Sequence, residues 1–375
     1  MIKYFNKKFK IIIILIFFIF ILCGCWDEKI FEKTGFITIM AIDYLDGTLK
    51  VTYGIPVTEP ETIEKAEIIE TKASLLREAR EKVRMKASKN YEGGTLQVIL
   101  ISREIAERGI ISLVNDVFER DTSNPALAWE VIVDGNADDW LKKMENLPDK
   151  PRTSIYLESL LERNEKAGYI PKTKIYSYDI INYAKGIDNV APLIKVRDKH
   201  IEVKGTALFS NGKMVGNIDA KSTGLLLAME GKLKDKNYEY ISQGMPNDPG
   251  GPKGGIANLI SEKNREIDVK IIDNKPVVNI KLDLFGSIEE YRTDDLNNNV
   301  TLENISNSVK IQLEKDCLSL IKYMQSVGSD PIGIGDIVRA KYNKYFNSKD
   351  WHEMYKSAKI NVQVKYFINH YGTIS

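Results

Sequence analysis

The sequence predicts a multi-domain protein of mixed α/β class, with mixed β-sheets flanked by helices and an N-terminal lipid anchor. Three observations predict this class. Runs with the two-residue period of strands alternate with runs of helical spacing. The length of 375 residues exceeds the size at which a single hydrophobic core usually stops growing, about 250 to 300 residues. Finally, a short apolar segment near the start of the chain ends in a cysteine.

Composition excludes several classes of protein. Hydrophobic residues make up 43% of the chain and charged residues 28%, as in ordinary globular proteins, which argues against a disordered or collagen-like chain. The 53 Lys plus Arg balance 52 Asp plus Glu, so the broad basic surface of a nucleic-acid binder is not expected. Three Cys, at 23, 25 and 317, cannot form a disulfide framework, and with His only at 200, 352 and 370 there is no closely spaced metal-ligand cluster. We therefore expect no metal and no cofactor.

The first 24 residues have the features of a signal peptide. Four lysines precede Ile11–Leu22, a run of twelve apolar residues. A helix of that length rises only about 18 Å, too short for a hydrocarbon core of about 30 Å. This pattern is typical of a secretory signal. Since no later segment approaches about 18 uninterrupted apolar residues, we expect the exported chain not to span a bilayer.

The segment Leu22–Cys25 resembles the lipobox of bacterial lipoproteins. Cys25 follows the small residue Gly24, as the acylated cysteine of that motif does. Choosing Cys23 instead would place the bulky Leu22 directly before the modified residue. We therefore predict lipidation at Cys25; the alternative is that Cys25 merely ends a hydrophobic anchor.

A hairpin is expected at the start of the exported chain. Strands at Phe36–Asp43 and Lys50–Val57 flank the turn Asp46-Gly47. Another short strand is expected at Glu64–Glu70. Apolar residues then recur at three- and four-residue intervals over Ala73–Ser88, which predicts an amphipathic helix.

The next segment alternates strands with helices. Thr95–Ser102 is a nearly continuous apolar run, typical of a strand buried on both faces. One or two short helices broken at Gly109 are expected in Arg103–Arg120. A strand at Ala128–Asp134 and a helix at Ala137–Met144 follow. This alternation predicts some parallel pairing.

The middle of the chain contains the clearest turn signal. Residues 145–200 are rich in proline, and apart from a helix at Ile155–Lys166 we expect mostly connecting structure at a domain edge. Gly205–Ile218 is predicted to form a hairpin, because Asn211-Gly212 supplies the positive φ angles of a type I′ turn. A short helix is expected at Ser222–Leu233.

The remaining chain is expected to begin with an exposed loop at Met245–Lys253. Two strands, Arg265–Ile272 and Pro276–Ile288, should flank Asp273-Asn274. A long helix at Leu302–Gln325 and a final strand at Lys359–Asn369 should follow. These elements suggest a signal peptide, an N-terminal α/β domain, a middle domain of hairpin plus helix, and a C-terminal domain with the long helix and a mixed sheet. The boundaries that we predict are 1–24, 25–196, 197–262 and 263–375.

Two glycine-rich segments resemble nucleotide-binding motifs only in part. Gly250–Gly255 lacks the Lys-Ser/Thr that would hold phosphate and Mg²⁺, so a flexible loop is favoured. Gly333–Val338 has two glycines of a dinucleotide fingerprint but valine where the third belongs. We interpret it as a helix N-terminus capped near Asp336.

No catalytic residue is predicted. Cys317 falls in the apolar stripe of the long helix, where a buried thiol is inert. His352 and His370 have no neighbouring Cys or Ser in the sequence. Adjacent acids project in different directions, so we interpret three carboxylate pairs as solvated charge: Asp138-Asp139, Glu289-Glu290 and Asp294-Asp295. The chain is therefore not expected to be an enzyme.

An ordered set of motifs resembles the Ger(x)C spore germination lipoproteins, the C subunits of germinant receptors. The resemblance covers residues 22 to 375. Its motifs, in order, are the lipobox with Cys25–Glu28, Gly35-Phe36, Ala41–Asp43, Lys204–Phe209, Lys213–Gly216, Gln325, Asp330–Gly335, Trp351, Ile360–Ile368 and Gly372.

The resemblance implies three α/β domains on a lipid tether at the outer face of the spore inner membrane. It also implies two partners, an integral membrane A subunit and a multi-spanning B subunit similar to amino-acid transporters. We expect a non-catalytic subunit that a nutrient-sensing receptor needs for the germination response. Two alternatives are an extracytoplasmic lipoprotein that binds a small solute between its domains and a tethered hydrolase whose Ser, His and Asp converge in space.

Overall fold

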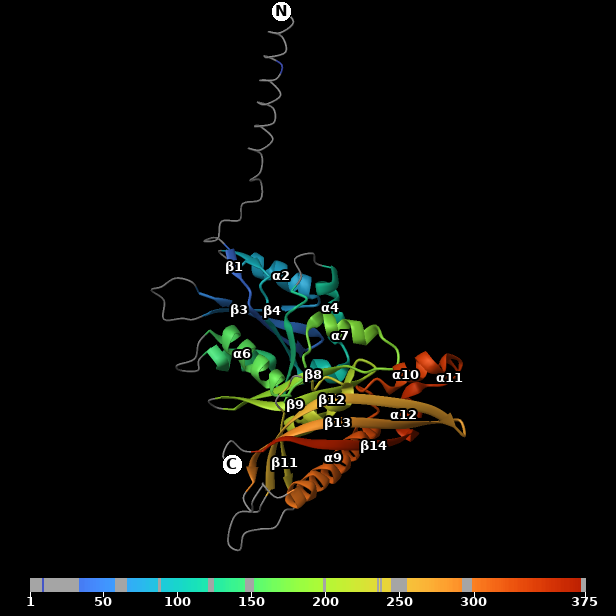
Figure 1. The fold of residues 1–375 in the computed structure, drawn as a ribbon. Coiled ribbons are helices and arrows are strands. Elements are labelled where there is room, and N and C mark those ends of the chain that lie inside the picture. Colours follow the sequence, from blue (N-terminus) through green and yellow to red (C-terminus); the bar gives the residue numbers. More distant parts are fainter. Residues whose placement is uncertain are drawn as a thin grey trace, which may run out of the picture.

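The computed structural model has a mixed α and β architecture, with mixed sheets flanked by helices (Figure 1). It describes residues 9, 34–57, 66–86, 89–120, 125–145, 152–197, 200–234, 236, 238–243, 255–291 and 299–371. Within these residues, no helix is both long and apolar enough to cross a membrane.

The larger sheet has eight strands in the order β10-β9-β8-β7-β6-β2-β3-β4. The central strands β8, β7, β6 and β2 are parallel, and the pairs toward both edges are antiparallel. A separate parallel pair joins the short strands β1 and β5. The bounds are β1 Thr34–Phe36, β2 Ile39–Leu45, β3 Thr48–Pro56, β4 Ala66–Ala73, β5 Asn90–Glu92, β6 Val98–Ser102, β7 Trp129–Val133, β8 Val190–Arg197, β9 His200–Ser210 and β10 Lys213–Asp219.

Helices cover both faces of this sheet, because alternate residues of its central strands contribute to two separate cores. Ile99 and Ile101 face one core, whereas Val98 and Leu100 face the other. The first core is covered by α2 Leu76–Arg84, α3 Arg103–Arg108, α4 Ile111–Arg120 and α7 Ile175–Tyr183. The second core is covered by α5 Ala137–Glu145 and α6 Thr153–Lys166.

The second half of the chain builds its own sheet, in the order β11-β12-β13-β14. The first two pairs are antiparallel, and β13 pairs with β14 in parallel. Its strands are β11 Tyr238–Gln243, β12 Gly255–Ile272, β13 Lys275–Tyr291 and β14 Lys359–Tyr371, and its helices are α8 Ala220–Glu230, α9 Asn299–Val327, α10 Ile334–Lys341, α11 Asn343–Asn347 and α12 Trp351–Ser357.

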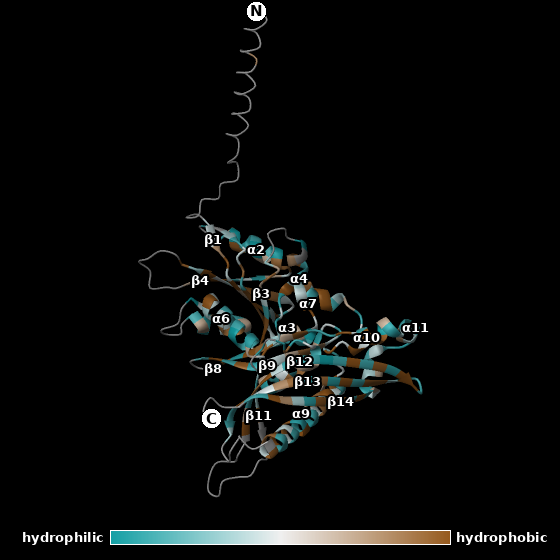
Figure 2. Ribbon diagram, viewed as in Figure 1, coloured by the Kyte–Doolittle hydropathy of each residue, from teal (hydrophilic) through white to brown (hydrophobic). Residues whose placement is uncertain are grey.

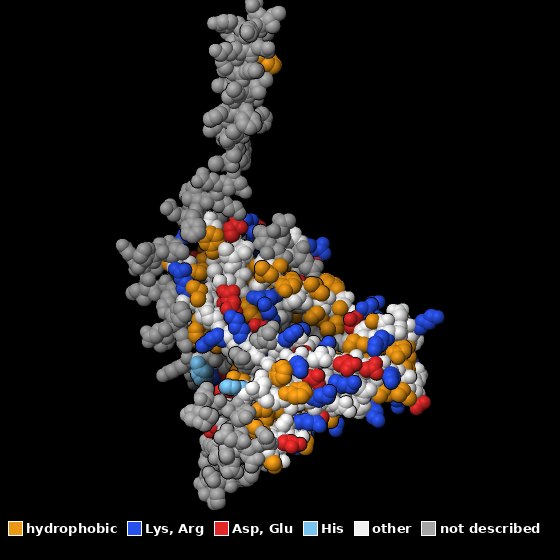
Figure 3. Space-filling model, viewed as in Figure 1, with side chains coloured by type: hydrophobic (Ala, Val, Ile, Leu, Met, Phe, Trp, Pro, Cys, Tyr) orange, Lys and Arg blue, Asp and Glu red, His pale blue; other side chains and the backbone are white. Residues whose placement is uncertain are grey.

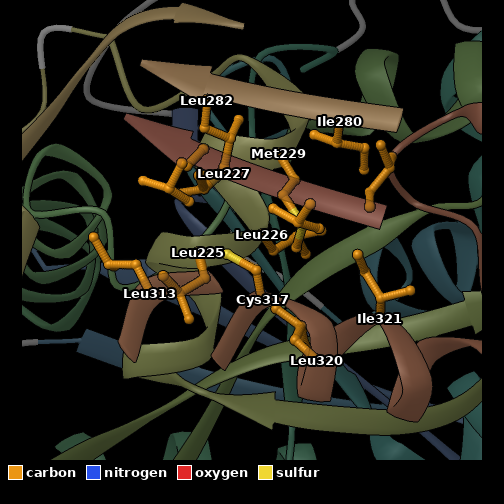
Figure 4. Packing of buried hydrophobic residues seen from close by; sticks show 14 of the residues in the cluster. Leu225, Leu226, Leu227, Met229, Ile280, Leu282, Leu313, Cys317, Leu320 and Ile321 are labelled. Atoms are coloured by element: carbon orange, nitrogen blue, oxygen red, sulfur yellow. The ribbon is translucent and has the colours of Figure 1, made fainter. Parts of the chain in front are cut away.

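The core of this half lies between helices α8 and α9 and the strands (Figure 4). Leu225, Leu226 and Leu227 of α8 are buried together with Leu313 and Cys317 of α9. The cluster also includes Val190 and Leu208, from β8 and β9 of the larger sheet. The core of the second half therefore continues into the larger sheet of the first half.

Both predicted hairpins with Asp-Gly and Asn-Gly turns are confirmed. Positive φ angles occur at Asp46 and Gly47 and again at Asn211 and Gly212. The long helix, the buried strand after Gly94 and the final strand are also present, with ends that differ by a few residues. The predicted loop Met245–Lys253 lies outside the described residues.

The prediction of mostly connecting structure at 145–200 is wrong, because α7 and β8 lie there. Helix α7 has little helical amphipathicity, since Tyr176 and Ile180 remain exposed while Ile175 is buried. Pro192 conceals β8 in the sequence, since proline is rare within strands. The predicted domain boundaries remain predictions. Strands β8 and β9 pair across the boundary at 196, and β12 continues through the boundary at 262.

The shared core predicts a large difference between two substitutions on α9. Leu313→Ala should lower the free energy of unfolding by about 2–5 kcal/mol, because Leu313 is fully buried and its truncation leaves a cavity. Ile311→Ala, on the exposed side of the same helix, should change it by no more than about 0.5 kcal/mol. Denaturant unfolding measures both, and similar losses would contradict this assignment of the core.

Candidate functional site

A buried carboxylate organises the turn after helix α9. Asp330 accepts hydrogen bonds from the backbone N–H groups of Gly333 and Ile334, both at 3.1 Å, and of Gly335, at 2.8 Å. The indole Nε1 of Trp351 donates to the same carboxylate at 3.0 Å. Four donors therefore surround a side chain that has no exposed surface, which offsets the cost of burying its charge.

This geometry corrects the predicted cap of helix α10. The segment does begin a helix, as predicted, but the buried carboxylate at its N-terminus belongs to Asp330. Asp336 lies in the first turn and accepts from the guanidinium of Arg339. The sequence prediction overlooked Asp330 because a proline separates it from the helix.

A second aspartate joins this turn to the first half of the chain. The Asp188 carboxylate accepts from the backbone N–H of Asp330 at 2.8 Å and from that of Asn211 at 3.3 Å. It also lies 3.2 Å from Nε2 of His352. In return, the backbone N–H of Asp188 donates to the Asp330 carbonyl at 3.0 Å. We call Asp188, Asp330, Trp351 and His352 the aspartate junction.

Two glycines allow the backbones to approach at the aspartate junction. Gly186 has φ +84°, and a Cβ atom there would lie 2.4 Å from the carbonyl carbon of Gly335. The Gly186 carbonyl accepts from the Asp336 N–H at 2.7 Å. A Cβ atom on Gly335 would lie 2.4 Å from Nε1 of Trp351. A side chain at Gly186 would therefore push its segment away from Gly335, and a side chain at Gly335 would push it away from Trp351.

Burial and charge shift the ionisation of the aspartate junction. Burial raises the pKa of Asp330 to about 7, while its N–H donors act in the opposite direction by favouring the carboxylate. The hydrogen bond to Asp188 raises the pKa of His352, and the charges of Asp188, Asp350 and Asp330 add to this effect. The imidazolium form of His352 is thus stabilised by the acids that face it.

A cavity of about 450 Å³ opens beside the aspartate junction. Its polar lining includes Ser112, Asn182, Asn211 and His352, with Trp351 on the apolar side. Ser112, Asn182 and Asn211 come from the first half of the chain, whereas Trp351 and His352 belong to α12. A small polar solute would therefore contact both halves at once.

The structure places the other candidate residues apart from one another. Cys317 is buried in α9, as predicted, and burial raises the pKa of its thiol to about 12. His370 lies on β14 and is exposed. Both ring nitrogens of His352 face carboxylates, Nε2 that of Asp188 and Nδ1 that of Asp350, at 3.2 and 3.8 Å. This arrangement leaves no nitrogen of His352 directed at a serine hydroxyl.

The interpretation of Asp138-Asp139 as solvated charge is wrong for Asp138. Its carboxylate is buried and bonded to the side chains of Lys50, Thr52 and Lys142, whereas Asp139 is exposed. Several predictions fall outside the described residues: the signal peptide with the lipidation site Cys25, the pair Asp294-Asp295, and residues 250 to 254 of the glycine-rich loop. Across the described ranges, no group of three or more His, Cys, Asp or Glu side chains is arranged to hold a metal ion.

A buried polar cluster that the sequence did not indicate lies between the sheet and helices α4 and α7. The side-chain amide of Asn115 donates to Glu130 of β7 at 2.9 Å and to Asp179 of α7 at 3.0 Å. Complete burial raises the pKa of Glu130 well above its ordinary value. Asn115 therefore fixes both helices to the strand beneath them.

Comparisons with known proteins match nearly the whole chain. A family described as "Spore germination protein N-terminal domain" matches residues 27–196, and "Spore germination B3/ GerAC like, C-terminal" matches residues 204–372. Spore germination protein GerQC of Bacillus cereus is 25% identical over 356 residues, which cover 94% of this chain and 95% of that protein. Spore germination protein B3 of Bacillus subtilis (strain 168) is 23% identical over 383 residues, 96% of this chain and 97% of that protein.

A solved structure has a similar fold. The crystal structure of the GerBC protein superposes with a TM-score of 0.58 at 19% sequence identity. The match covers 88% of this chain and 96% of that chain. The overall fold thus belongs to an architecture already seen by experiment.

The close approach at Gly186 predicts that its substitution is costly. Gly186→Ala should lower the free energy of unfolding by more than about 3 kcal/mol, because backbone collision adds to the strain of positive φ. Gly47→Ala is the matched control, since Gly47 has φ +82° and open space around it, and should lose only about 1 kcal/mol. Equal losses in denaturant unfolding would show that the contact with Gly335 contributes nothing.

The ionisation of the aspartate junction predicts a loss of stability as pH rises. A raised histidine pKa gives stability that is complete below the ordinary value of about 6.5 and disappears as pH passes the folded value. Because the pKa of Asp330 is also raised, its ionisation likewise lowers stability as pH rises, up to pH about 7. The melting temperature should therefore fall as pH rises through about 7, and less steeply in His352→Gln. His370→Gln, at an exposed site, should follow the unmodified chain; identical pH profiles for all three would refute the assignment.

Proposed function

The chain belongs to the GerAC-like family of spore germination proteins, and from this premise we propose that it is the lipid-anchored, non-catalytic C subunit of a nutrient-sensing germinant receptor. Family membership supports a role in spore germination. The finer statements, on the anchor, the partners and the lack of catalysis, are part of our proposal.

The observation that carries the proposal is the aspartate junction. Asp188 lies in the part of the chain that matches the N-terminal family, and Asp330 and His352 lie in the part that matches the C-terminal family. Hydrogen bonds to the buried Asp188 carboxylate couple the two parts more rigidly than a flexible linker would. A displacement at one end of the protein would thus reach the other, as a receptor subunit requires.

Anchoring follows from the N-terminal sequence. Acylation of Cys25 would tether the exported chain to the extracytoplasmic face of the spore inner membrane. There it would meet the integral A and B subunits of the receptor. The names of the relatives, each a spore germination protein, support this setting.

A second candidate function is that of an extracytoplasmic solute-binding lipoprotein. The cavity beside the aspartate junction favours it, because both halves of the chain contribute polar groups such as Asn182 and His352. This candidate requires saturable binding of an amino acid or sugar to the purified protein, which calorimetry measures. The first proposal does not require such binding.

Two cysteines separated by one glycine, Cys23 and Cys25, allow a matched test of the anchor. Cys25→Ala should reduce the membrane-bound fraction by about tenfold or more, because two or three acyl chains supply the membrane affinity. Germination in response to nutrients should decline with it. Cys23→Ala should leave both unchanged, since Cys23 would be removed with the signal peptide. Fractionation of spores and germination assays measure the outcome; normal retention and germination of Cys25→Ala would overturn the proposal.

A further inference from the structure

Strand β7 carries an acidic residue in the interior of the large sheet. All five residues of this strand are buried, and Glu130 is the charged residue type among them. Because side chains alternate along a strand, Glu130 and Ile132 face the core under α4 and α7, whereas Trp129 faces the opposite core. Glu130 has no exposed surface. A carboxylate in this position needs hydrogen-bond donors to replace its lost hydration.

The side-chain amide of Asn115 supplies such donors only in part. Its Nδ2 donates one hydrogen to Oε2 of Glu130 at 2.9 Å and the other to Oδ1 of Asp179 at 3.0 Å, so both amide hydrogens are used. Among the described residues, Oε1 of Glu130 and Oδ1 of Asn115 have no hydrogen-bond partner. If Glu130 is ionised, both oxygens only accept, and each carries the cost of an unmade buried hydrogen bond.

One proton would satisfy both oxygens. A protonated carboxyl group has one O–H donor and keeps an acceptor. With the proton on Oε1, Glu130 donates to Oδ1 of Asn115 while its Oε2 still accepts from Nδ2. The amide and the carboxyl group are both planar and hold their two polar atoms side by side, which suits this double hydrogen bond. The neutral pair also leaves no net charge on Glu130 to be buried.

The surroundings of Glu130 favour its neutral form. Its partner on α4 is an uncharged amide, and its charged neighbour on α7 is Asp179, whose negative charge adds to burial in raising the pKa of Glu130. Burial also keeps the hydroxyl of Tyr178 on α7 neutral, by raising its pKa. Within the described ranges, no Lys or Arg lowers the pKa of Glu130. Lys174 instead lies over the Trp129 ring, 4.0 Å from its centroid, and that ring faces the opposite core.

The pair lies where α4 and α7 attach to the sheet. Asn115 belongs to α4 and Asp179 to α7, so both helices meet Glu130 through one amide. Apolar residues of α7 such as Ile180 point outward, and Figures 2 and 3 show hydrophobic side chains on the outside of this layer. The same two helices line the cavity beside the aspartate junction, α4 through Ser112 and α7 through Asn182. A shift of either helix would therefore reshape that cavity.

We propose that Glu130 is a proton-binding site: in the folded protein it is a neutral carboxylic acid paired with the amide of Asn115, and loss of its proton loosens α4 and α7 from the sheet. Ionisation breaks the O–H bond at Oε1, the proton passes to water, and the electron pair stays on Oε1, which then opposes Oδ1 of Asn115. The cavity beside the aspartate junction thereby becomes sensitive to pH. Neither the anchor nor the receptor role is needed for this site.

Glu130→Gln tests the bound proton, because the glutamine amide supplies an N–H where the acid supplies its O–H and so preserves the pairing. Infrared spectroscopy of the full-length chain at neutral pH detects the carbonyl stretch of protonated carboxyl groups, which carboxylates lack. We expect one such band in the unmodified chain to be lost in Glu130→Gln. The matched control is Glu78→Gln, which should keep the band, because the carboxylate of Glu78 pairs with Lys82 at 2.6 Å and its pKa is lowered.

The dependence of stability on pH gives a second readout. Because the pKa of folded Glu130 is raised, the folded chain holds a proton that the unfolded chain releases above the ordinary value of about 4.3. Relative to Glu130→Gln, the folded-to-unfolded ratio of the unmodified chain should fall by up to about tenfold per pH unit, until the folded pKa is passed. The aspartate junction ionises in both chains, so its effect cancels. Amide hydrogen exchange, corrected for its intrinsic pH dependence, should show the loss of protection first in α4 and α7.

Three results would overturn the proposal, each in a different part. If no carbonyl band disappears in Glu130→Gln, Glu130 is a carboxylate, and a water molecule that donates to both oxygens takes the place of the proton. If the band disappears but exchange in α4 and α7 responds to pH as it does in Glu130→Gln, the proton is bound and the loosening of the helices is wrong. Should Glu130→Gln fail to fold, the unmodified chain with isotope-labelled glutamate decides, because the absence of any protonated glutamate band at neutral pH excludes the bound proton.

Discussion

The burial of the Asp330 carboxylate is the constraint on which the rest of the architecture depends. A charged group without solvent is tolerated only where donors surround it, and here four N–H groups do so. Three come from the start of α10 and one from Trp351. The turn, the helix and the tryptophan must therefore be in place together. Their arrangement in turn presents the Asp330 backbone to Asp188.

This constraint links two halves that match separate families. Asp188 is held by the backbone of the β9–β10 turn and by His352, so it contacts elements from both sides. Because Gly186 and Gly335 lack side chains, the two backbones meet directly at this point. The continuous core between α8, α9 and the larger sheet extends the coupling beyond the polar contacts. The two halves of the chain can therefore act as one body.

Local patterns in the sequence predicted much of the fold and little of the site. Asn211-Gly212 determines its own turn, and the spacing of apolar residues in α9 is a property of one helix. The contact between Asp188 and Asp330 joins positions 142 residues apart, which no local pattern reveals. The burial of Asp138 is hidden in the sequence for the same reason, because its partners Lys50 and Thr52 lie far away along the chain, on β3. Helix α7 was missed because its outward face is apolar.

The two halves of the chain, each matching its own family, unfold and move as one unit through the aspartate junction. Calorimetry of the unmodified chain and of Asp188→Ala tests it directly, because removing that carboxylate leaves the donors of Asp330, Asn211 and His352 without their acceptor. We expect a single cooperative transition for the unmodified chain and two separated transitions for the variant. Two transitions already present in the unmodified chain, with a spacing that Asp188→Ala does not change, would contradict it.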